Sequence, residues 1–189
     1  MKTSPVRPVL TAVWCGICLA ACSKPEAASS PTATTQGPTS DPCALTSDNE
    51  VRKVFADAKA GVRDHSLDKY DIATCTWDTP ANTFVVQLFT AHGSAEDEVR
   101  SRISGSVDPV KPGAGANIRY DSLAGIGDSA VVAAEKADDQ QGILADAAVL
   151  GIRRGERMVV LFSRSLIDGD RAATVKGLEA LGRDAATRL

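Results

Sequence analysis

Residues 143–164 have the sequence ILADAAVLGIRRGERMVVLFSR and predict two antiparallel strands. The runs 143–153 and 156–164 are rich in the apolar and β-branched residues that favour strands, and Arg154-Gly155 supplies a turn between them. Two such runs joined by so short a connection pair as a β-hairpin. We therefore expect an antiparallel sheet that contains this hairpin.

Further strands are expected before the hairpin in the sequence. Residues 72–77 and 83–90 are two strand-like runs on either side of a turn that contains proline, and residues 130–135 form another. Side chains alternate between the two faces of a strand, so Ala73, Cys75 and Trp77 share one face. We expect that face to be turned to the core.

Three segments carry the signals of helices. Each starts at a residue type that caps a helix N-terminus, and apolar residues follow at helical spacing. The expected helices begin after Ser47, Ser94 and Asp168-Gly169-Asp170, and they end at Gly61, at Gly105 and at residue 189. Residues 108–128 hold two Pro and four Gly and are expected to be a long irregular connection. Helices at the start, middle and end, with hairpins between them, predict an α+β fold, in which helices cover a single antiparallel sheet.

Length and charge limit the possible functions. The chain has 189 residues, enough for one domain after a leader and a linker. Its 21 basic and 24 acidic side chains give a formal charge of −3, and no basic run exceeds two residues. Binding to a nucleic acid depends on clustered positive charge, so no nucleic-acid partner is expected.

The first 22 residues indicate export and lipidation. Lys2 and Arg7 precede an apolar run, residues 9–21, that is too short for a permanent membrane span. The run ends in Leu19-Ala20-Ala21-Cys22, which resembles the lipobox of bacterial lipoproteins, where a lipid is attached to the Cys thiol and the chain is cut just before it. Residues 1–21 are therefore expected to be a signal peptide and Cys22 a lipid anchor in the membrane. The alternative is an ordinary cleaved signal that happens to be followed by a cysteine.

Residues 22–42 are expected to be a tether and residues 43–189 a globular domain. Between residues 23 and 42 there are eight Ser or Thr and four Pro, a composition that cannot bury enough apolar surface to fold. Loss of residues 1–21 leaves 19 basic and 24 acidic side chains, a formal charge of −5. The predicted location is the cell envelope: the outer membrane facing the periplasm in a Gram-negative cell, or otherwise the outer face of the plasma membrane.

Five cysteines become two after processing. Cys15 and Cys18 leave with the signal peptide, and Cys22 is consumed by the lipid. Cys43 and Cys75 remain, and in an oxidising compartment the simplest expectation is a disulfide between them. The domain is thus expected to be closed by one disulfide.

Three short motifs carry a resemblance to a known family. They are Asp41-Pro42-Cys43-Ala44-Leu45-Thr46, Cys75-Thr76-Trp77 and Gly125-Ile126-Gly127-Asp128-Ser129-Ala130. In order and spacing they resemble an uncharacterised family of small bacterial lipoproteins, best known from actinobacteria, although this chain has one Leu where two are common. The chain is also similar to the Mog1/PsbP-like sandwich, some of whose members are thought to bind apolar small molecules or lipid. The resemblance implies the Cys43–Cys75 disulfide and supplies no catalytic residues.

No reaction is indicated by the remaining motifs. His65 and His92 are the only histidines, too few for a histidine-rich metal site, and no metal or other cofactor is expected. Gly125-Ile126-Gly127 matches part of a dinucleotide fingerprint, but a strand is expected after it where that site needs a helix. The protein is expected not to be an enzyme.

Two groups of residues are candidates for binding. Loop residues form the first: Lys111, Asn117, Arg119, Tyr120 and Asp128. Basic residues around the final hairpin form the second: Arg153, Arg154, Arg157 and Arg164. A loop on a rigid scaffold often contacts a partner, and a local basic group attracts anionic surfaces. The alternatives are a plain connection for the first group and pairing with neighbouring acids for the second.

The leading hypothesis is a lipid-anchored, non-enzymatic binding module for another protein or a small apolar ligand. The alternative is an immunity or inhibitor lipoprotein that neutralises an envelope-acting toxin or hydrolase. A pocket lined by apolar residues favours the first reading, and a convex or acidic patch without a cavity favours the second.

Overall fold

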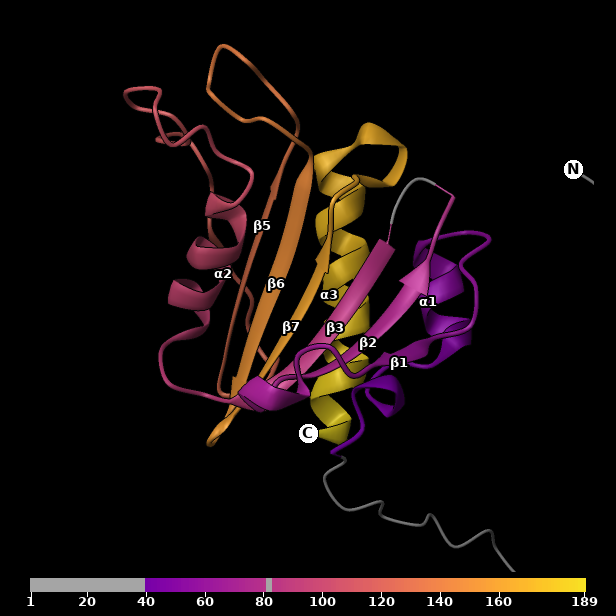
Figure 1. Cartoon of the computed structure of the whole chain (residues 1–189). Helices are drawn as coiled ribbons and strands as arrows, with labels where there is room; N and C mark the ends of the chain where they lie inside the picture. Colours follow the sequence, from indigo (N-terminus) through magenta and orange to yellow (C-terminus); the bar gives the residue numbers. More distant parts are fainter. Residues whose placement is uncertain (1–39, 81–82) are drawn as a thin grey trace, which may run out of the picture. The chain divides into compact units, whose positions relative to one another are not determined.

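The computed structural model describes residues 40–80 and 83–189 (Figure 1). The expected signal peptide, Cys22 and most of the expected tether lie outside these residues. The expected domain start at Cys43 falls inside the first element, the 3-10 helix η1 (Pro42–Ala44). Pro42 is buried and the Asp41 carboxylate accepts a hydrogen bond from the Cys43 N–H, so this element begins one residue before the expected boundary.

The fold is one antiparallel sheet of seven strands with helices packed on it, which confirms the α+β prediction. The strand order is β1-β2-β3-β7-β6-β5-β4. The strands are β1 (Val62–Asp64), β2 (Ala73–Asp78), β3 (Thr83–Thr90), β4 (Asp121–Ser122), β5 (Ser129–Glu135), β6 (Ala147–Arg154) and β7 (Arg157–Ser163). Short 3-10 helices also lie at η2 (Asp68–Tyr70) and η3 (Ile167–Gly169).

At the centre of the sheet, strands that are far apart in the sequence pair with each other. In the β3–β7 ladder, Phe84 lies opposite Ser163 and Thr90 lies opposite Arg157. The other ladders join strands that follow one another along the chain. The sheet is therefore two local meanders, β1 to β3 and β4 to β7, which meet along one seam.

The helix α3 (Arg171–Arg188) lies along one face of the sheet, with α1 (Asp48–Val54) and η1 on the same side (Figure 1). Asp170 caps α3, because its carboxylate accepts hydrogen bonds from the N–H groups of Ala172 and Ala173. A β-carbon at Gly182 would lie 2.5 Å from the Leu150 side chain, so only glycine permits this approach of α3 to β6. Cys75 and Trp77 are fully buried on this face, as the strand pattern predicts.

The helix α2 (Ala95–Ser104) covers part of the opposite face, over β5 and β6. Ser94 caps it as predicted, and its apolar residues Ala95, Val99 and Ile103 are buried against the sheet. A β-carbon at Gly151 would lie 2.8 Å from the Ala95 carbonyl oxygen, so β6 approaches this helix closely because it has glycine there. Of the helices in the described part of the chain, none has both the length and the hydropathy that a membrane span needs.

The predicted disulfide between Cys43 and Cys75 is present, with Cα atoms 5.1 Å apart. It fastens η1 to β2. A second connection to β2 is made by Asp48 of α1. Its carboxylate oxygen Oδ1 accepts hydrogen bonds from the Gly61 N–H at 2.9 Å and from the Trp77 indole N–H at 2.8 Å. This carboxylate gives the buried Trp77 its polar partner, and the two hydrogen bonds hold the pKa of Asp48 below its usual value.

Five details of the expected elements are wrong. The first helix ends at Val54 and not at Gly61, because Phe55 takes an extended backbone, with φ of −116° and ψ of 92°, and the chain then reverses at Asp57, whose φ is 62°. Strands β1 and β4 were not expected, since each is too short to show a repeating pattern. Strand β6 begins at residue 147 rather than 143. The last hairpin turns at Gly155-Glu156, one residue later than expected, because Gly155 takes a positive φ of 58°.

Candidate functional site

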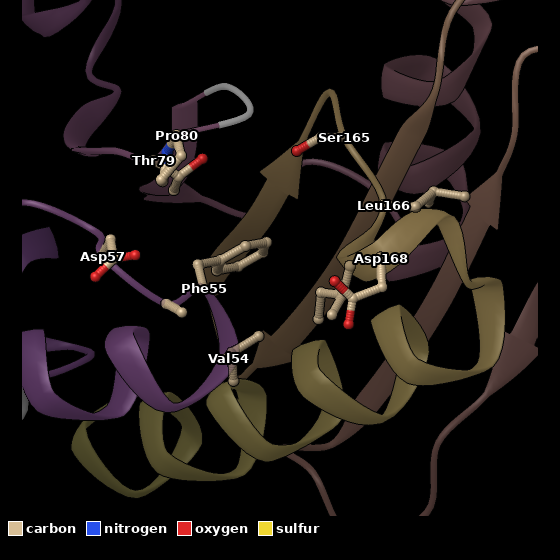
Figure 2. A pocket seen from close by; sticks show the side chains of 10 residues that line it. Val54, Phe55, Asp57, Thr79, Pro80, Ser165, Leu166 and Asp168 are labelled. Carbon is tan, nitrogen blue, oxygen red and sulfur yellow. The ribbon is translucent and has the colours of Figure 1, made fainter.

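The strongest candidate site is a pocket of about 310 Å³ whose lining is mostly apolar (Figure 2). We call it the Phe55 pocket. Three separate segments line it: the end of α1 and the turn after it, the residues that follow β2, and the connection from β7 to α3. The lining residues are Val54, Phe55, Ala56, Asp57, Thr79, Pro80, Ser165, Leu166, Ile167 and Asp168.

The left-handed turn after α1 shapes one wall of the Phe55 pocket. The chain leaves the helix at Phe55, which has an extended backbone, and reverses at Asp57. The Phe55 ring is almost completely buried and packs on Phe84, with ring centroids 5.1 Å apart. Figure 2 shows Phe55 at the centre of the lining residues. The pocket is thus built on an aromatic pair that belongs to the core.

Short-range hydrogen bonds fix the opposite wall. The Ser165 N–H donates to Ser163 Oγ at 3.2 Å, and the Ile167 N–H donates to Thr174 Oγ1 at 2.8 Å. Leu166 between them is buried. Asp168 then takes a left-handed backbone, with φ of 51°, before the chain enters α3. Because these bonds involve backbone groups on both sides of Leu166, the apolar side chains of this wall are held in place before any ligand binds.

Two carboxylates flank the apolar centre of the Phe55 pocket. Asp57 and Asp168 are both exposed, and Figure 2 shows them on opposite sides of Phe55. Within the described residues, neither carboxylate has a hydrogen bond or an ion pair. They are two of the three non-glycine residues with left-handed backbone in the described chain, the third being Asp71. Left-handed non-glycine residues often lie at functional sites, where other contacts stabilise the strained conformation.

The lining of the Phe55 pocket suits binding better than chemistry. Its hydroxyl and carboxylate groups come from Thr79, Ser165, Asp57 and Asp168. Ser165 Oγ lies 3.1 Å from Ser163 Oγ, so its hydrogen bond goes to another hydroxyl and not to a base. No histidine or cysteine is among the described lining residues. In the described ranges, 40–80 and 83–189, no group of three or more His, Cys, Asp or Glu is placed to hold a metal ion.

Comparison of the chain with protein families, with curated proteins and with solved structures found no match. The candidate site therefore depends on the geometry of this chain alone.

The predicted loop residues are held by their neighbours. The ammonium group of Lys111 donates to the Asp139 carbonyl, and Arg119 pairs with Asp121 at 3.2 Å. Tyr120 packs under the Arg100 guanidinium, which lies 3.9 Å from its ring centroid, and burial raises the pKa of its hydroxyl. The side-chain amide of Asn117 makes a long contact of 3.5 Å with Gln141 Oε1. These partners fasten the loop to α2, to β4 and to the connection between β5 and β6. Binding by the loop stays a prediction.

The predicted basic residues lie mostly at the other end of β7 from the Phe55 pocket. We call that end, around Gly155-Glu156, the turn end. Arg153 donates to the Gly155 carbonyl, Arg154 to the Ala186 carbonyl and Arg157 to the Leu189 carbonyl. The loop residue Asp128 joins this group, because its carboxylate accepts from the Gly155 N–H at 2.6 Å. Asp128 and Arg154 share a polar pocket of about 440 Å³, but within the described residues their side chains bond to the chain's own backbone. Arg164 is exposed at the end of β7.

A larger pocket, of about 530 Å³, lies beside α2 and is less suited to an apolar ligand. Its lining includes Glu98 and Arg102, which form an ion pair at 2.8 Å. The Arg102 guanidinium also lies 5.9 Å from the Phe162 ring centroid. Charged groups that already pair with each other have little left to offer a ligand, and a ligand would have to desolvate them.

No pattern in the sequence indicates the Phe55 pocket. Of the expected cap Asp168-Gly169-Asp170, Asp170 does cap α3, whereas Asp168 lines the pocket. The only local signal was Asp168-Gly169, a pair that is typical of tight turns. Nothing in the sequence near Asp57 indicates that it faces a segment more than a hundred residues away.

Proposed function

We propose that this protein is a lipid-anchored envelope lipoprotein that binds a small apolar ligand in the Phe55 pocket. The pocket is the single observation that carries the binding role. It has a mostly apolar lining and a volume at the lower limit of ligand sites, about 300 Å³, and backbone hydrogen bonds hold one of its walls. The lipobox at Cys22 and the Ser/Thr/Pro-rich tether support the anchored location.

The resemblance to the small bacterial lipoproteins supports the lipoprotein part of the proposal. Its first two motifs contain Cys43 and Cys75, and the disulfide joins them. Its third motif places Asp128 where its carboxylate accepts from the Gly155 N–H, so it connects two turns of the sheet. All three motifs thus have a structural role, and the Phe55 pocket uses none of their residues.

Binding is tested with a neutral apolar probe, octyl glucoside, below its micelle concentration. In ¹H–¹⁵N NMR spectra of the domain we expect shifts confined to residues near 54–57 and 165–168. Ala56→Trp places a large ring at the pocket and should abolish these shifts. Ala116→Trp, at an exposed turn residue outside the pocket lining, is the matched control and should preserve them. Shifts elsewhere only, or shifts that Ala56→Trp leaves intact, contradict the binding role.

Anchoring is tested separately with Cys22→Ala. Because Cys22 supplies the only thiol at the lipobox junction, the variant is expected to lose palmitate labelling in cells. Labelling that persists in this variant contradicts the anchor and leaves the pocket unaffected.

A further inference from the structure

We infer that the Phe55 pocket selects ligands that carry a positive charge, and that its ligand class is an apolar chain with an amine or ammonium group. This inference rests on the proposed function, because it specifies the ligand of the same pocket. It is carried by the two flanking carboxylates, Asp57 and Asp168, in combination with the apolar lining between them.

The two carboxylates are available to a ligand. Several exposed acids elsewhere in the described chain pair with a base: Glu50 with Lys53 at 2.6 Å, Glu96 with Arg100 at 2.6 Å and Asp78 with Lys59 at 3.3 Å. Asp57 and Asp168 have no such partner among the described residues. A ligand cation is therefore the group that their charge complements.

Three lysines near the Phe55 pocket form no ion pair with Asp57 or Asp168 within the described residues. Lys53 and Lys59, on either side of Asp57 in the sequence, are held by Glu50 and Asp78. Lys136 is near the other carboxylate, since its ammonium lies 4.0 Å from the position of a β-carbon on Gly169. It makes no ion pair with Asp168 within the described structure. The pocket therefore has an apolar centre with acidic groups on two sides.

This arrangement specifies the chemistry of the occupant. The apolar part of the ligand displaces water from Phe55, Leu166 and their neighbours, which is favourable in proportion to the apolar area buried. A cationic group at the rim is attracted to two carboxylates, whereas an anionic group is repelled by both. An apolar chain with a carboxylate head should therefore be rejected, although its tail fits equally well.

The test compares three probes that share one octyl chain: octyltrimethylammonium, octyl glucoside and octanoate, all below their micelle concentrations. Affinities are measured by NMR titration at residues near 54–57 and 165–168, at low and at high salt. We expect the cationic probe to bind most tightly, the neutral probe next and the anionic probe least. The preference for the cation should shrink with added salt, because these charges are exposed to solvent.

The variant Asp57→Asn/Asp168→Asn removes both charges and keeps a residue type that tolerates left-handed backbone. We expect it to weaken binding of octyltrimethylammonium about fivefold and to leave octyl glucoside unchanged. The matched control is Asp71→Asn, an exposed left-handed aspartate that lines the pocket beside α2 instead. It should leave the affinities for all three probes unchanged.

The possible outcomes separate this inference from the proposed function. Equal affinity for the three probes, or a cation preference that survives loss of both carboxylates, overturns the inference and keeps an apolar pocket. No binding of any probe at residues 54–57 and 165–168 overturns the proposed function itself. A cation preference that disappears in the double variant and persists in Asp71→Asn supports both.

Discussion

The charged side chains at the two ends of β7 differ in whether they have bonding partners within the described chain. At the turn end, Arg153, Arg154, Arg157 and Asp128 all bond to backbone groups of the same chain. At the Phe55 pocket, Asp57 and Asp168 bond to none of the described residues, and both occupy left-handed backbone. Charge that has an internal partner holds loops together, whereas charge without one is free to recognise a ligand. Asp57 and Asp168, which have no partner among the described residues, are therefore the groups on which the proposed ligand specificity depends.

The largest effect should come from the disulfide, which fastens η1 to the sheet. It closes a loop with a sequence separation of 32, and its loss is expected to cost about 3.5 to 4 kcal/mol through the entropy of the unfolded chain. Reduction, or Cys43→Ala/Cys75→Ala, should lower the midpoint of thermal unfolding by about 5 °C or more, measured by calorimetry. Two free thiols in the unreduced, denatured domain would contradict the link itself.

Asp48→Ala should have the next largest effect, because it leaves the buried Trp77 indole N–H without its partner. We expect a loss of about 1 to 3 kcal/mol in the free energy of unfolding, measured with denaturant. Asp48→Asn is the control, since its amide oxygen can accept the same hydrogen bonds.

The pH dependence of these variants has a definite sign. Hydrogen bonds from Gly61 and Trp77 lower the pKa of Asp48 in the folded state. The charge therefore stabilises the fold above the ordinary value of 3.8, and this contribution disappears as the pH falls through the lower folded value. The stability advantage of the wild type over Asp48→Asn should shrink at acidic pH. An advantage that grows on acidification would refute the assignment.

A smaller change in the free energy of unfolding tests the comparison between the turn end and the Phe55 pocket directly. Asp128→Ala removes the acceptor of the Gly155 N–H and should cost about 1 kcal/mol. Asp57→Asn and Asp168→Asn remove charges that bond to none of the described residues, so their stabilities should stay within about 0.5 kcal/mol of the wild type. All three are measured by denaturant unfolding under one set of conditions. A large loss at Asp57 or Asp168 would show that these carboxylates are structural.

The smallest effect is expected at Asp184 on α3, and it should have the opposite sign to that of Asp48. Burial raises the pKa of this carboxyl, although Arg188 opposes the shift, and Oδ2 has no hydrogen bond within the described residues. A raised folded pKa means that the folded state retains its proton at higher pH than the unfolded state. The wild type should therefore lose stability relative to Asp184→Asn as the pH rises from below 3.8 to neutral. Denaturant unfolding at several pH values measures the slope, and a slope like that of Asp48 would contradict it.

Local patterns predicted the sheet, two helix caps and the buried faces, because each of these depends on residues that are close in the sequence. The disulfide could be predicted because only two cysteines remain after the expected processing. The alternation around Cys75 and the cap at Ser94 are examples, and both are confirmed. Local patterns failed where the chain reverses at a residue without an obvious turn signal. The helix α1 ends early, at an extended Phe55, and the chain then reverses at Asp57. The three-residue strand β1 is stabilised by its pairing with β2 rather than by its own composition.

The candidate site was hidden for a similar reason. Residues 54–57, 79–80 and 165–168 meet only after β2, β3 and β7 have paired, so no window of sequence contains the Phe55 pocket. The arginines at 153, 154 and 157, by contrast, are conspicuous in the sequence, and their bonds to Ala186 and Leu189 become visible only with α3 in place.

The seam between β3 and β7 also has a consequence for the order of folding. Every other ladder closes between strands that follow one another along the chain, but this one pairs Phe84 with Ser163, which are 79 positions apart in the sequence. Closing so long a loop lowers the entropy of the chain before any stabilising contact has formed, and contacts between residues distant in the sequence therefore slow folding. We therefore expect each meander to form early and the seam to close in the rate-limiting step. The Phe55 pocket, whose walls come from both meanders, would then appear only when folding is complete.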